Sequence, residues 1–336
     1  MIEKNMYIRI LSKDDLINSG CFDYKKAIEV SEDAFIKYAT GDVVFPNKIS
    51  VVFDEDSQNR INCLPAAILS ENVYGMKWVS VFPNNPKFHK KQNLTAVYLL
   101  SELKTGFPIA FMEGSMCSNM RTASVGAIAA KYLANNNSRC IGFIGAGEQA
   151  RSHFLSITEV LPRIEICKVS SRTTESVESF IAEMREYNKN IKFINCGNNY
   201  ESAIIDSDVI VTAISSQEAI LKAEWIKKGA FYCHVAGLED EFAVALKADK
   251  IICDNWESVK HRTQTISRMY QGGLLTDNDI YADLHEIILG EKPGREDEDE
   301  FVYFNSVGMS FVDIALANWM YKEALKADKG LELKMK

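Results

Sequence analysis

The stretch Ile141-Gly142-Phe143-Ile144-Gly145-Ala146-Gly147-Glu148-Gln149-Ala150 decides the fold of this chain. It reads as a short apolar strand, a Gly-x-Gly-x-x-Ala turn and the start of a helix, which is the pattern of a pyrophosphate-binding turn. Gly145 permits the tight turn, Gly147 lacks the Cβ that would hold a diphosphate away, and Ala150 lets the helix pack closely on the strand. The sequence therefore predicts a dinucleotide-binding site at this turn.

The first residues of the following helix belong to the same predicted site. Free backbone N–H groups and the positive end of the helix dipole favour a bound phosphate. Glu148 and Gln149 therefore join Gly145, Gly147 and Ala150 as predicted cofactor-binding residues.

The end of the next apolar strand, residues 164–169, bears on which dinucleotide binds. An NAD-binding chain normally has a carboxylate there for the adenosine ribose, whereas this chain has Ser170-Ser171-Arg172-Thr173. No acid would repel a 2′-phosphate, and two hydroxyls with a guanidinium could bind one. We therefore expect NAD(P) as cofactor, with a preference for NADP(H); the alternative is an ordinary polar loop in which Arg172 faces water.

Strand and helix patterns alternate on both sides of this turn and indicate an α/β fold with a doubly wound parallel sheet, the Rossmann type. The predicted strands of this sheet are 141–144, 164–169, 191–194, 209–212, 231–235 and 251–253, and a helix over 115–134 leads into the first. We assign residues 117–308 to the dinucleotide-binding domain.

The remainder, residues 1–116 and 309–336, predicts a smaller α+β domain. A helix is expected from Tyr24 to Ala39, where Gly41 stops it, and a last helix from about 309 to 326. Strands are predicted at 49–53, 61–64, 74–81, 95–100 and 108–112, the last two as a hairpin, which favours an antiparallel or mixed sheet.

Composition limits the class of protein. The chain has 336 residues, 47% of them hydrophobic, and a formal net charge of −8, which argues against a nucleic-acid or anionic-membrane partner. No apolar run reaches the length of a membrane span, and the residues at the start lack a secretory pattern, so we expect a cytoplasmic protein. The eight cysteines form no CxxC pair and the five histidines show no ligand spacing, so neither disulfides nor a metal site are expected.

Four further patterns carry a resemblance. They are Gly75-Met76-Lys77-Trp78-Val79, Met120-Arg121-Thr122-Ala123-Ser124, Gly142-Phe143-Ile144-Gly145-Ala146-Gly147, and Asn305-Ser306-Val307-Gly308-Met309 followed by Asp313. In order and over nearly the whole length, the chain resembles the ornithine cyclodeaminase/mu-crystallin family. The resemblance implies a homodimer that binds a small amino-acid substrate, in which residues 1–116 and 309–336 serve substrate binding and dimerisation. It also implies that Thr122 and Asn305 are among the cofactor-binding residues.

Within that family, three shorter patterns are similar to a siderophore-pathway branch. They are Lys77-Trp78, Pro108-Ile109-Ala110 with Met112-Glu113, and Pro293-Gly294-Arg295-Glu296-Asp297. This similarity implies an NAD(P)-dependent enzyme that cleaves N-(2-amino-2-carboxyethyl)-L-glutamate oxidatively to 2,3-diaminopropionate and 2-oxoglutarate. Ornithine cyclodeamination, reduction of a cyclic imino acid and mu-crystallin-like NADP(H)-dependent ligand binding stay open as alternatives.

The chemistry places demands on particular side chains. Hydride transfer at an amino-acid α-carbon needs an anchored carboxylate and a deprotonated nitrogen. Arg121 offers a bidentate fork for the carboxylate, and Lys77 is an ammonium that can exchange a proton if burial depresses its pKa. Without the resemblance, a lysine facing solvent and an arginine in a surface salt bridge are the simpler interpretations. Lys48, in Pro46-Asn47-Lys48, stands where cyclodeaminases carry an arginine for the substrate carboxylate.

The sequence offers more than one candidate for the catalytic acid. The family has a catalytic Gly-x-Asp after a strand, but this chain has His234-Val235-Ala236-Gly237-Leu238-Glu239-Asp240. Glu239 and Asp240 are both candidates, and either could instead begin the next helix. His234 is a candidate acid or base, with a partly buried structural histidine as the alternative. The acidic stretch Glu296–Glu300 is expected to be a solvated turn.

Overall fold

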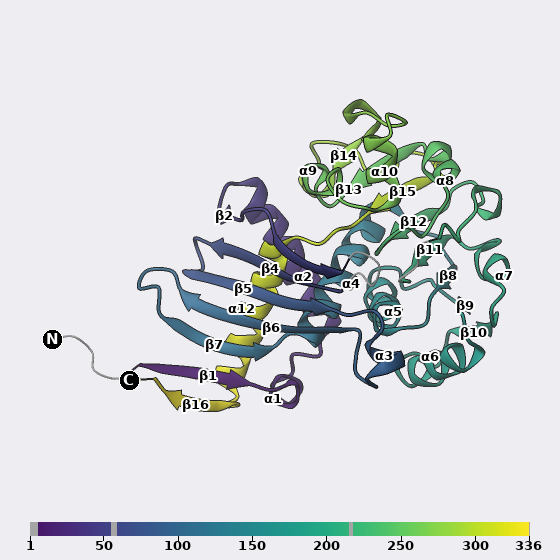
Figure 1. Ribbon diagram of the computed structural model, residues 1–336. Coiled ribbons are helices and arrows are strands. Elements are labelled where there is room, and N and C mark those ends of the chain that lie inside the picture. Colours follow the sequence, from purple (N-terminus) through teal and green to yellow (C-terminus); the bar gives the residue numbers. More distant parts are fainter. Residues whose placement is uncertain (1–5, 55–58, 215–217, 336) are drawn as a thin grey trace. The chain divides into compact units, whose positions relative to one another are not determined.

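The computed structural model describes residues 6–54, 59–214 and 218–335 and divides the chain into two compact units (Figure 1). Unit 1 comprises Met1–Arg121 and Met309–Lys336, and unit 2 comprises Thr122–Gly308. Helix α4 (Ser115–Leu133) carries the chain from one unit into the other. The boundary expected from sequence, at residues 116 and 117, falls inside the same helix. None of the helices described is long and apolar enough to cross a membrane.

Unit 1 is built on a mixed sheet in the order β16-β1-β7-β6-β5-β4-β2, with β3 paired to β4. Its strands are β1 (Tyr7–Leu11), β2 (Val43–Val44), β3 (Ile49–Asp54), β4 (Asn59–Ile68), β5 (Val73–Val81), β6 (Leu94–Glu102), β7 (Pro108–Glu113) and β16 (Leu331–Lys334). The predicted hairpin is the antiparallel pair β6–β7. The edge pair β1 and β16 was not predicted; β16 has only four residues, and all of them are exposed.

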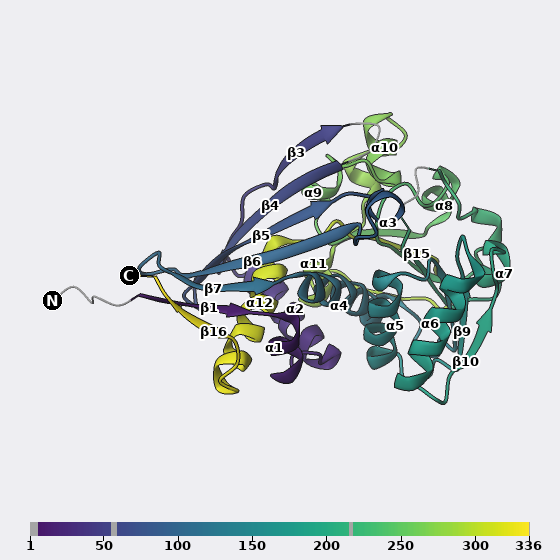
Figure 2. The same cartoon turned by 60° about the horizontal axis from the view of Figure 1, so that its bottom comes forward.

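Helices cover one face of this sheet. Figure 2 shows α2 (Tyr24–Ala39) and α12 (Ser310–Lys326) on the same side of the strands. The side chains of β5 alternate accordingly, since Lys77 and Val79 are buried while Tyr74 and Trp78 are exposed on the other face. A Cβ on Gly75 would lie 2.9 Å from Ile314 Cδ1, so glycine at this position lets α12 approach β5 closely. The short helices α1 (Lys13–Asn18) and α3 (Asn85–Phe88) complete the unit.

Unit 2 is a fully parallel sheet in the order β10-β9-β8-β11-β12-β15-β13-β14, and the predicted doubly wound fold is confirmed. Its strands are β8 (Cys140–Ile144), β9 (Ile166–Ser170), β10 (Lys192–Asn195), β11 (Val209–Thr212), β12 (Phe231–His234), β13 (Lys250–Cys253), β14 (Ala282–Asp283) and β15 (Val302–Asn305). The chain runs outward from β8 through β9 to β10 and then returns to β11 on the other side of β8. The carboxyl ends of β8 and β11 therefore form the topological switch point, where ligands of such sheets bind.

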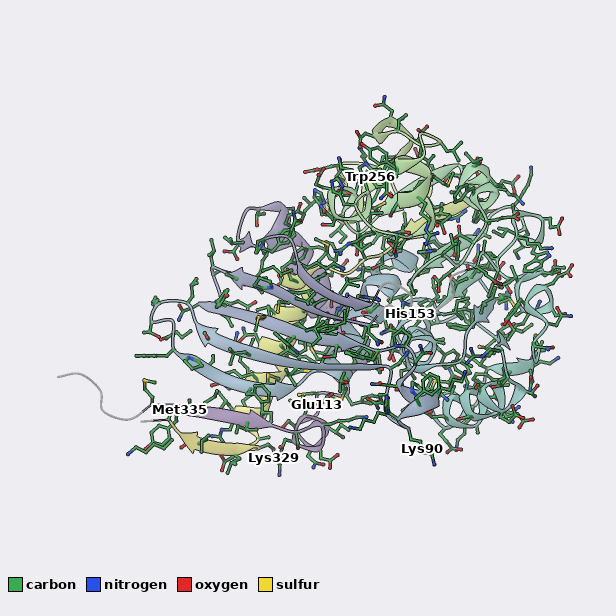
Figure 3. All side chains as sticks on the ribbon, viewed as in Figure 1. Lys90, Glu113, His153, Trp256, Lys329 and Met335 are labelled. Atoms are coloured by element: carbon green, nitrogen blue, oxygen red, sulfur yellow. The ribbon has the colours of Figure 1, made fainter. Side chains whose placement is uncertain are left out.

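The helices of unit 2 bury apolar side chains. They are α5 (Glu148–Val160), α6 (Thr174–Tyr187), α7 (Tyr200–Ile204), α8 (Phe242–Lys247), α9 (Trp256–Val259), α10 (Thr265–Gln271) and α11 (Leu284–Ile288). Ala203, Val244 and Ile266 bring α7, α8 and α10 into one cluster with Tyr232 and Tyr303 of the sheet. On α5, His153 (Figure 3) is buried, and its ring would lie within 3 Å of a Cβ on Gly126 of α4.

The acidic stretch near residue 296 is more structured than expected, so that expectation was wrong in part. The ammonium of the buried Lys250 lies 2.7 Å from Glu296 and 3.1 Å from Glu300, and the Glu300 side chain is only 16% exposed. The neighbouring Arg295 donates to the backbone oxygens of Leu133, at the end of α4, and of Ala230. The acidic residues of this turn neutralise the buried Lys250. Because Lys250 is distant in the sequence, the local pattern could not reveal this pairing.

Candidate functional site

The predicted pyrophosphate turn lies at the switch point of the parallel sheet. Gly145 has φ 111°, and its N–H donates to the Ser170 carbonyl at 2.8 Å, which joins the ends of β8 and β9. A Cβ on Gly145 would lie 2.6 Å from the carbonyl oxygen of Ala213, just after β11. Both the backbone angle and the close approach therefore require glycine at this position.

Gly147 caps the N-terminus of α5 and leaves open space above it. Its φ of −87° suits any residue, and a Cβ built there would meet no atom of the described residues within 4 Å. Gly147 and Glu148 are exposed, Gln149 is half-buried and Ala150 is buried against the strand side. The turn therefore does not need glycine at this position for its own fold. A glycine beside the N-terminus of a helix does leave room for a bound diphosphate.

The residues at the end of β9 differ in burial: Ser170 is buried, whereas Ser171 and Arg172 are more exposed. The Ser170 hydroxyl is fully buried and donates to the carbonyl of Phe143, so it is already committed within the fold. Ser171 is half-buried and Arg172 is exposed. Of the three residues predicted to meet a 2′-phosphate, the geometry thus leaves Ser171 and Arg172 in a suitable place.

Asn305 ends β15, between His234 of β12 and Cys253 of β13. Gln264 orients its side chain, because the Gln264 amide nitrogen donates to the carbonyls of Ala236 and Ser306 at 2.8 and 3.0 Å. The Gln264 oxygen then accepts from Asn305 Nδ2 at 2.9 Å. Asn305 is fully buried, and its predicted contact with cofactor stays a prediction.

In unit 1, Lys77 and Arg121 meet on one carboxylate. Lys77 Nζ lies 2.8 Å from Asp313 Oδ2, and Arg121 Nε lies 2.9 Å from Asp313 Oδ1. The Tyr98 hydroxyl donates to the same Oδ1 at 2.6 Å. Asp313 is 0% exposed, Lys77 2% and Arg121 8%, so the simpler interpretations of a solvent-facing lysine and a surface arginine are both wrong.

Each member of this cluster is placed by its own element. Lys77 lies on the helix-covered face of β5, Tyr98 is opposite it on β6, and Asp313 belongs to the first turn of α12. Arg121 is on α4, whose start is fixed by Glu113 at the end of β7 (Figure 3): the Glu113 carboxylate accepts from the N–H groups of Ser115 and Met116. Sequence reasoning noted Asp313 only as part of a motif and missed its role as the shared counter-ion.

The electrostatics of the cluster favour proton exchange at Lys77. Burial, reinforced by the charge of Arg121, lowers the pKa of Lys77 to about 8, although Asp313 opposes the shift. For Asp313, burial acts to raise the pKa, but the charges of Arg121 and Lys77 outweigh it and hold that pKa below its ordinary value. Near neutral pH the cluster therefore contains the ionised carboxylate of Asp313, the guanidinium of Arg121 and the amine of Lys77, which can change its protonation state.

Lys48 and Thr122 lie outside this cluster. Lys48 is half-buried in the segment between β2 and β3, and among the described residues no hydrogen bond or ion pair joins it to Lys77, Arg121 or Asp313. Thr122 is half-buried on α4, one residue after Arg121. The structure thus brings Lys77 together with Arg121 but not with Lys48, whose predicted role in substrate binding stays a prediction.

The candidate acids lie together in the interior of unit 2. Glu239, Asp240 and His234 are all 0% exposed, and His234 Nε2 lies 3.4 Å from Asp240 Oδ1 and 3.7 Å from Glu239 Oε2. Burial raises the pKa values of Glu239 and Asp240 to about 7 and lowers the pKa of His234 to about 4. His234 is therefore a neutral histidine that is fully buried, whereas its simpler interpretation expected a partly buried one.

Comparison with known proteins agrees with this architecture. The model of the ornithine cyclodeaminase/mu-crystallin family matches residues 17–328. The chain belongs to this family. The resemblance expected from the four sequence motifs is thereby confirmed.

Three relatives illustrate the range of the family. The chain is 28% identical to N-((2S)-2-amino-2-carboxyethyl)-L-glutamate dehydrogenase of Staphylococcus aureus, over 98% of this chain and 99% of that protein. It is similar to the structure of Thermococcus litoralis Δ1-pyrroline-2-carboxylate reductase in complex with NADH and L-proline, with a TM-score of 0.91, 30% identity, and coverage of 96% and 99%. An archaeal alanine dehydrogenase dimer with bound NAD matches with a TM-score of 0.89, 30% identity, and coverage of 98% and 100%.

Proposed function

We propose that this protein is an NAD(P)-dependent oxidoreductase that acts on a carbon–nitrogen bond of an amino acid through an imine. The observation that carries the proposal is the buried cluster of Lys77, Arg121 and Asp313, together with the open diphosphate turn at Gly147. A buried amine of lowered pKa is what proton transfer at a substrate nitrogen requires, and a guanidinium suits a carboxylate. The relatives, named as dehydrogenases and reductases, support the same class of reaction.

The protein's own groups have separate tasks in this reaction. Arg121 binds the substrate α-carboxylate, and Lys77 in its neutral form takes a proton from the substrate nitrogen. Asp313 keeps both side chains in place through its two oxygens. The residues of the Gly145–Ala150 turn hold the dinucleotide, which when bound supplies the hydride acceptor.

The leading substrate is N-(2-amino-2-carboxyethyl)-L-glutamate. Its oxidation at the glutamate α-carbon moves a hydride to NAD(P)+ and leaves an imine; water adds to the imine carbon, and the C–N bond breaks to give 2,3-diaminopropionate and 2-oxoglutarate. The S. aureus relative and the three motifs shared with that branch support this assignment. Product analysis by mass spectrometry tests it: both products must appear in equal amounts, and formation of neither would reject the substrate.

A second candidate is reduction of a cyclic imino acid. The T. litoralis reductase, 30% identical and bound to L-proline, favours it, because the same carboxylate and proton-transfer groups would serve there. Ornithine cyclisation is less well supported, since the acid of the family's Gly-x-Asp has no clear counterpart in this chain. A mu-crystallin-like binding protein would give no reason for a buried amine of lowered pKa.

We propose a preference for NADP(H), carried by Arg172. Its exposed guanidinium stands at the end of β9, where no acid is present in Ser170-Ser171-Arg172-Thr173. Replacing Arg172 with alanine should weaken NADPH binding about tenfold, roughly 1.4 kcal/mol, and change NADH binding less than twofold. Fluorescence titration of both reduced cofactors measures this; tighter binding of NADH by the unchanged protein would contradict the preference.

We further propose a homodimer that covers the exposed face of the unit 1 sheet. Tyr74, Trp78 and Phe111 are each more than 40% exposed, and the strand register sets Phe111 beside Leu99 and Leu99 beside Met76. Such a continuous apolar face is unusual on a monomer. Sedimentation should show a dimer that Trp78→Glu converts to monomer; a monomeric unchanged protein would contradict the proposal.

A further inference from the structure

Glu239 occupies an unusual place for a catalytic acid, because protein donors surround its carboxylate. Oε1 accepts from the N–H of Ile214 at 2.7 Å. Oε2 accepts from the Thr212 hydroxyl at 2.8 Å and from the N–H groups of Ala236 and Val235 at 3.0 and 3.2 Å. Each carboxylate oxygen has about two lone-pair sites, so protein donors fully occupy Oε2 and occupy one site of Oε1.

The four donors come from two loops at the ligand-binding edge of the parallel sheet. Thr212 and Ile214 lie where β11 ends, and Val235 and Ala236 lie where β12 ends. Glu239 therefore ties together the loop after β11, which pairs with β8, and the loop after β12, which pairs with β11. The backbone N–H groups of Ile214, Val235 and Ala236 thus share this single side chain as their acceptor.

The loop after β11 is also the wall of the pyrophosphate turn. A Cβ on Gly145 would lie 2.6 Å from Ala213 O and 3.0 Å from Ile214 Cγ2, so the turn rests directly on these two residues. The Ala213 N–H donates in turn to Ile144, the last residue of β8. A shift of Ile214 away from Glu239 would consequently move the surface that shapes the turn.

We propose that Glu239 is a positioning residue that braces the pyrophosphate turn through Ile214, and not an acid that exchanges protons with substrate. This inference rests on the proposed dinucleotide-dependent function and assigns a residue to it. Its neighbour Asp240 has a different set of partners, since its carboxylate accepts from Thr265 Oγ1 at 2.6 Å and lies 3.4 Å from His234 Nε2. The two adjacent acids thus differ in what they support.

The substitution Glu239→Gln tests the proposal. An amide can offer only one oxygen, so its NH2 group must oppose either the Ile214 N–H or the three donors on the other side. We expect the dissociation constant of the reduced cofactor, measured by fluorescence titration without substrate, to rise about tenfold. At saturating cofactor, kcat should fall less than about threefold, because no proton passes through this group.

Two further variants distinguish the loss of the Glu239 hydrogen bonds from a general destabilisation of the fold. Glu241→Gln makes the same change two residues away, where the carboxylate accepts from Ala223 N, and should leave cofactor affinity unchanged. Thr212→Val removes one donor to Glu239 at nearly constant volume and should raise the dissociation constant by a few fold. If Glu239→Gln does not fold, Thr212→Val decides the question.

The possible results are distinguishable. A dissociation constant that rises for Glu239→Gln and Thr212→Val, with kcat kept, supports the brace. An unchanged dissociation constant with kcat reduced by about a thousandfold would make Glu239 a catalytic acid and overturn the proposal. Unchanged values of both quantities would overturn it as well. If the unchanged protein binds neither reduced cofactor, the proposed function itself fails, and the brace fails with it.

Discussion

Replacing Lys77 with methionine should reduce turnover about a thousandfold while leaving the dissociation constant of the cofactor unchanged within twofold. The reason is that Lys77 carries the proposed proton transfer but lies in unit 1, whereas the predicted cofactor-binding turn is in unit 2. Methionine fills a similar volume, and Asp313 retains Tyr98 and Arg121 as partners, so the variant should fold. Steady-state kinetics with a parallel cofactor titration measure both quantities.

Two controls sharpen this prediction. Lys250→Met removes another buried lysine, paired with Glu296 and Glu300, and should lower stability but keep kcat in the folded protein. In the unchanged protein, kcat/KM for amino-acid oxidation should rise with pH and level off above about 8, since neutral Lys77 is the proton acceptor and its pKa is lowered to about 8. Full turnover in Lys77→Met would refute its catalytic role.

Replacing Gly147 with alanine should weaken cofactor binding about thirtyfold, roughly 2 kcal/mol, without changing the melting temperature. The added methyl meets no atom within 4 Å in the part of the chain that the structure describes, and the backbone angle is ordinary, so we expect it to disturb the bound diphosphate and not the fold. Isothermal titration with the reduced cofactor and a thermal melt of the free protein measure the two effects.

Gly145→Ala provides the contrasting case. There the methyl would lie 2.6 Å from Ala213 O and the backbone is left-handed at φ 111°, so the variant should lose stability even without cofactor. Unweakened cofactor binding by Gly147→Ala would mean that the diphosphate lies elsewhere.

The sequence predicted the parallel sheet well because its signals are local. The Gly-x-Gly-x-x-Ala turn, the helix Glu148–Val160 and the strand Val209–Thr212 each carry a continuous pattern, and the structure has both elements at these bounds. The strand β15 was missed, although it lies between β12 and β13, because four apolar residues after an acidic turn give no periodicity.

The site was predictable only where a motif fixes the chemistry of a single residue. Lys77 and Arg121 could be named from their motifs, but their meeting on Asp313, more than 190 positions further along the chain, depends on α12 packing against β5. Likewise, no local pattern distinguishes Glu239 from Asp240. What separates them is the set of backbone donors that the folded loops present, which only the tertiary structure defines.

The most direct test of the proposed oxidoreductase function is reduction of the cofactor by substrate. Purified protein is mixed with NAD+ or NADP+ and N-(2-amino-2-carboxyethyl)-L-glutamate, with ornithine and L-proline in parallel, and the absorbance of reduced nicotinamide is followed. We expect a rise with an amino-acid substrate, foremost the glutamate derivative, that Lys77→Met abolishes. No rise with any of these substrates, in protein shown to bind the cofactor, would contradict the proposed oxidoreductase function.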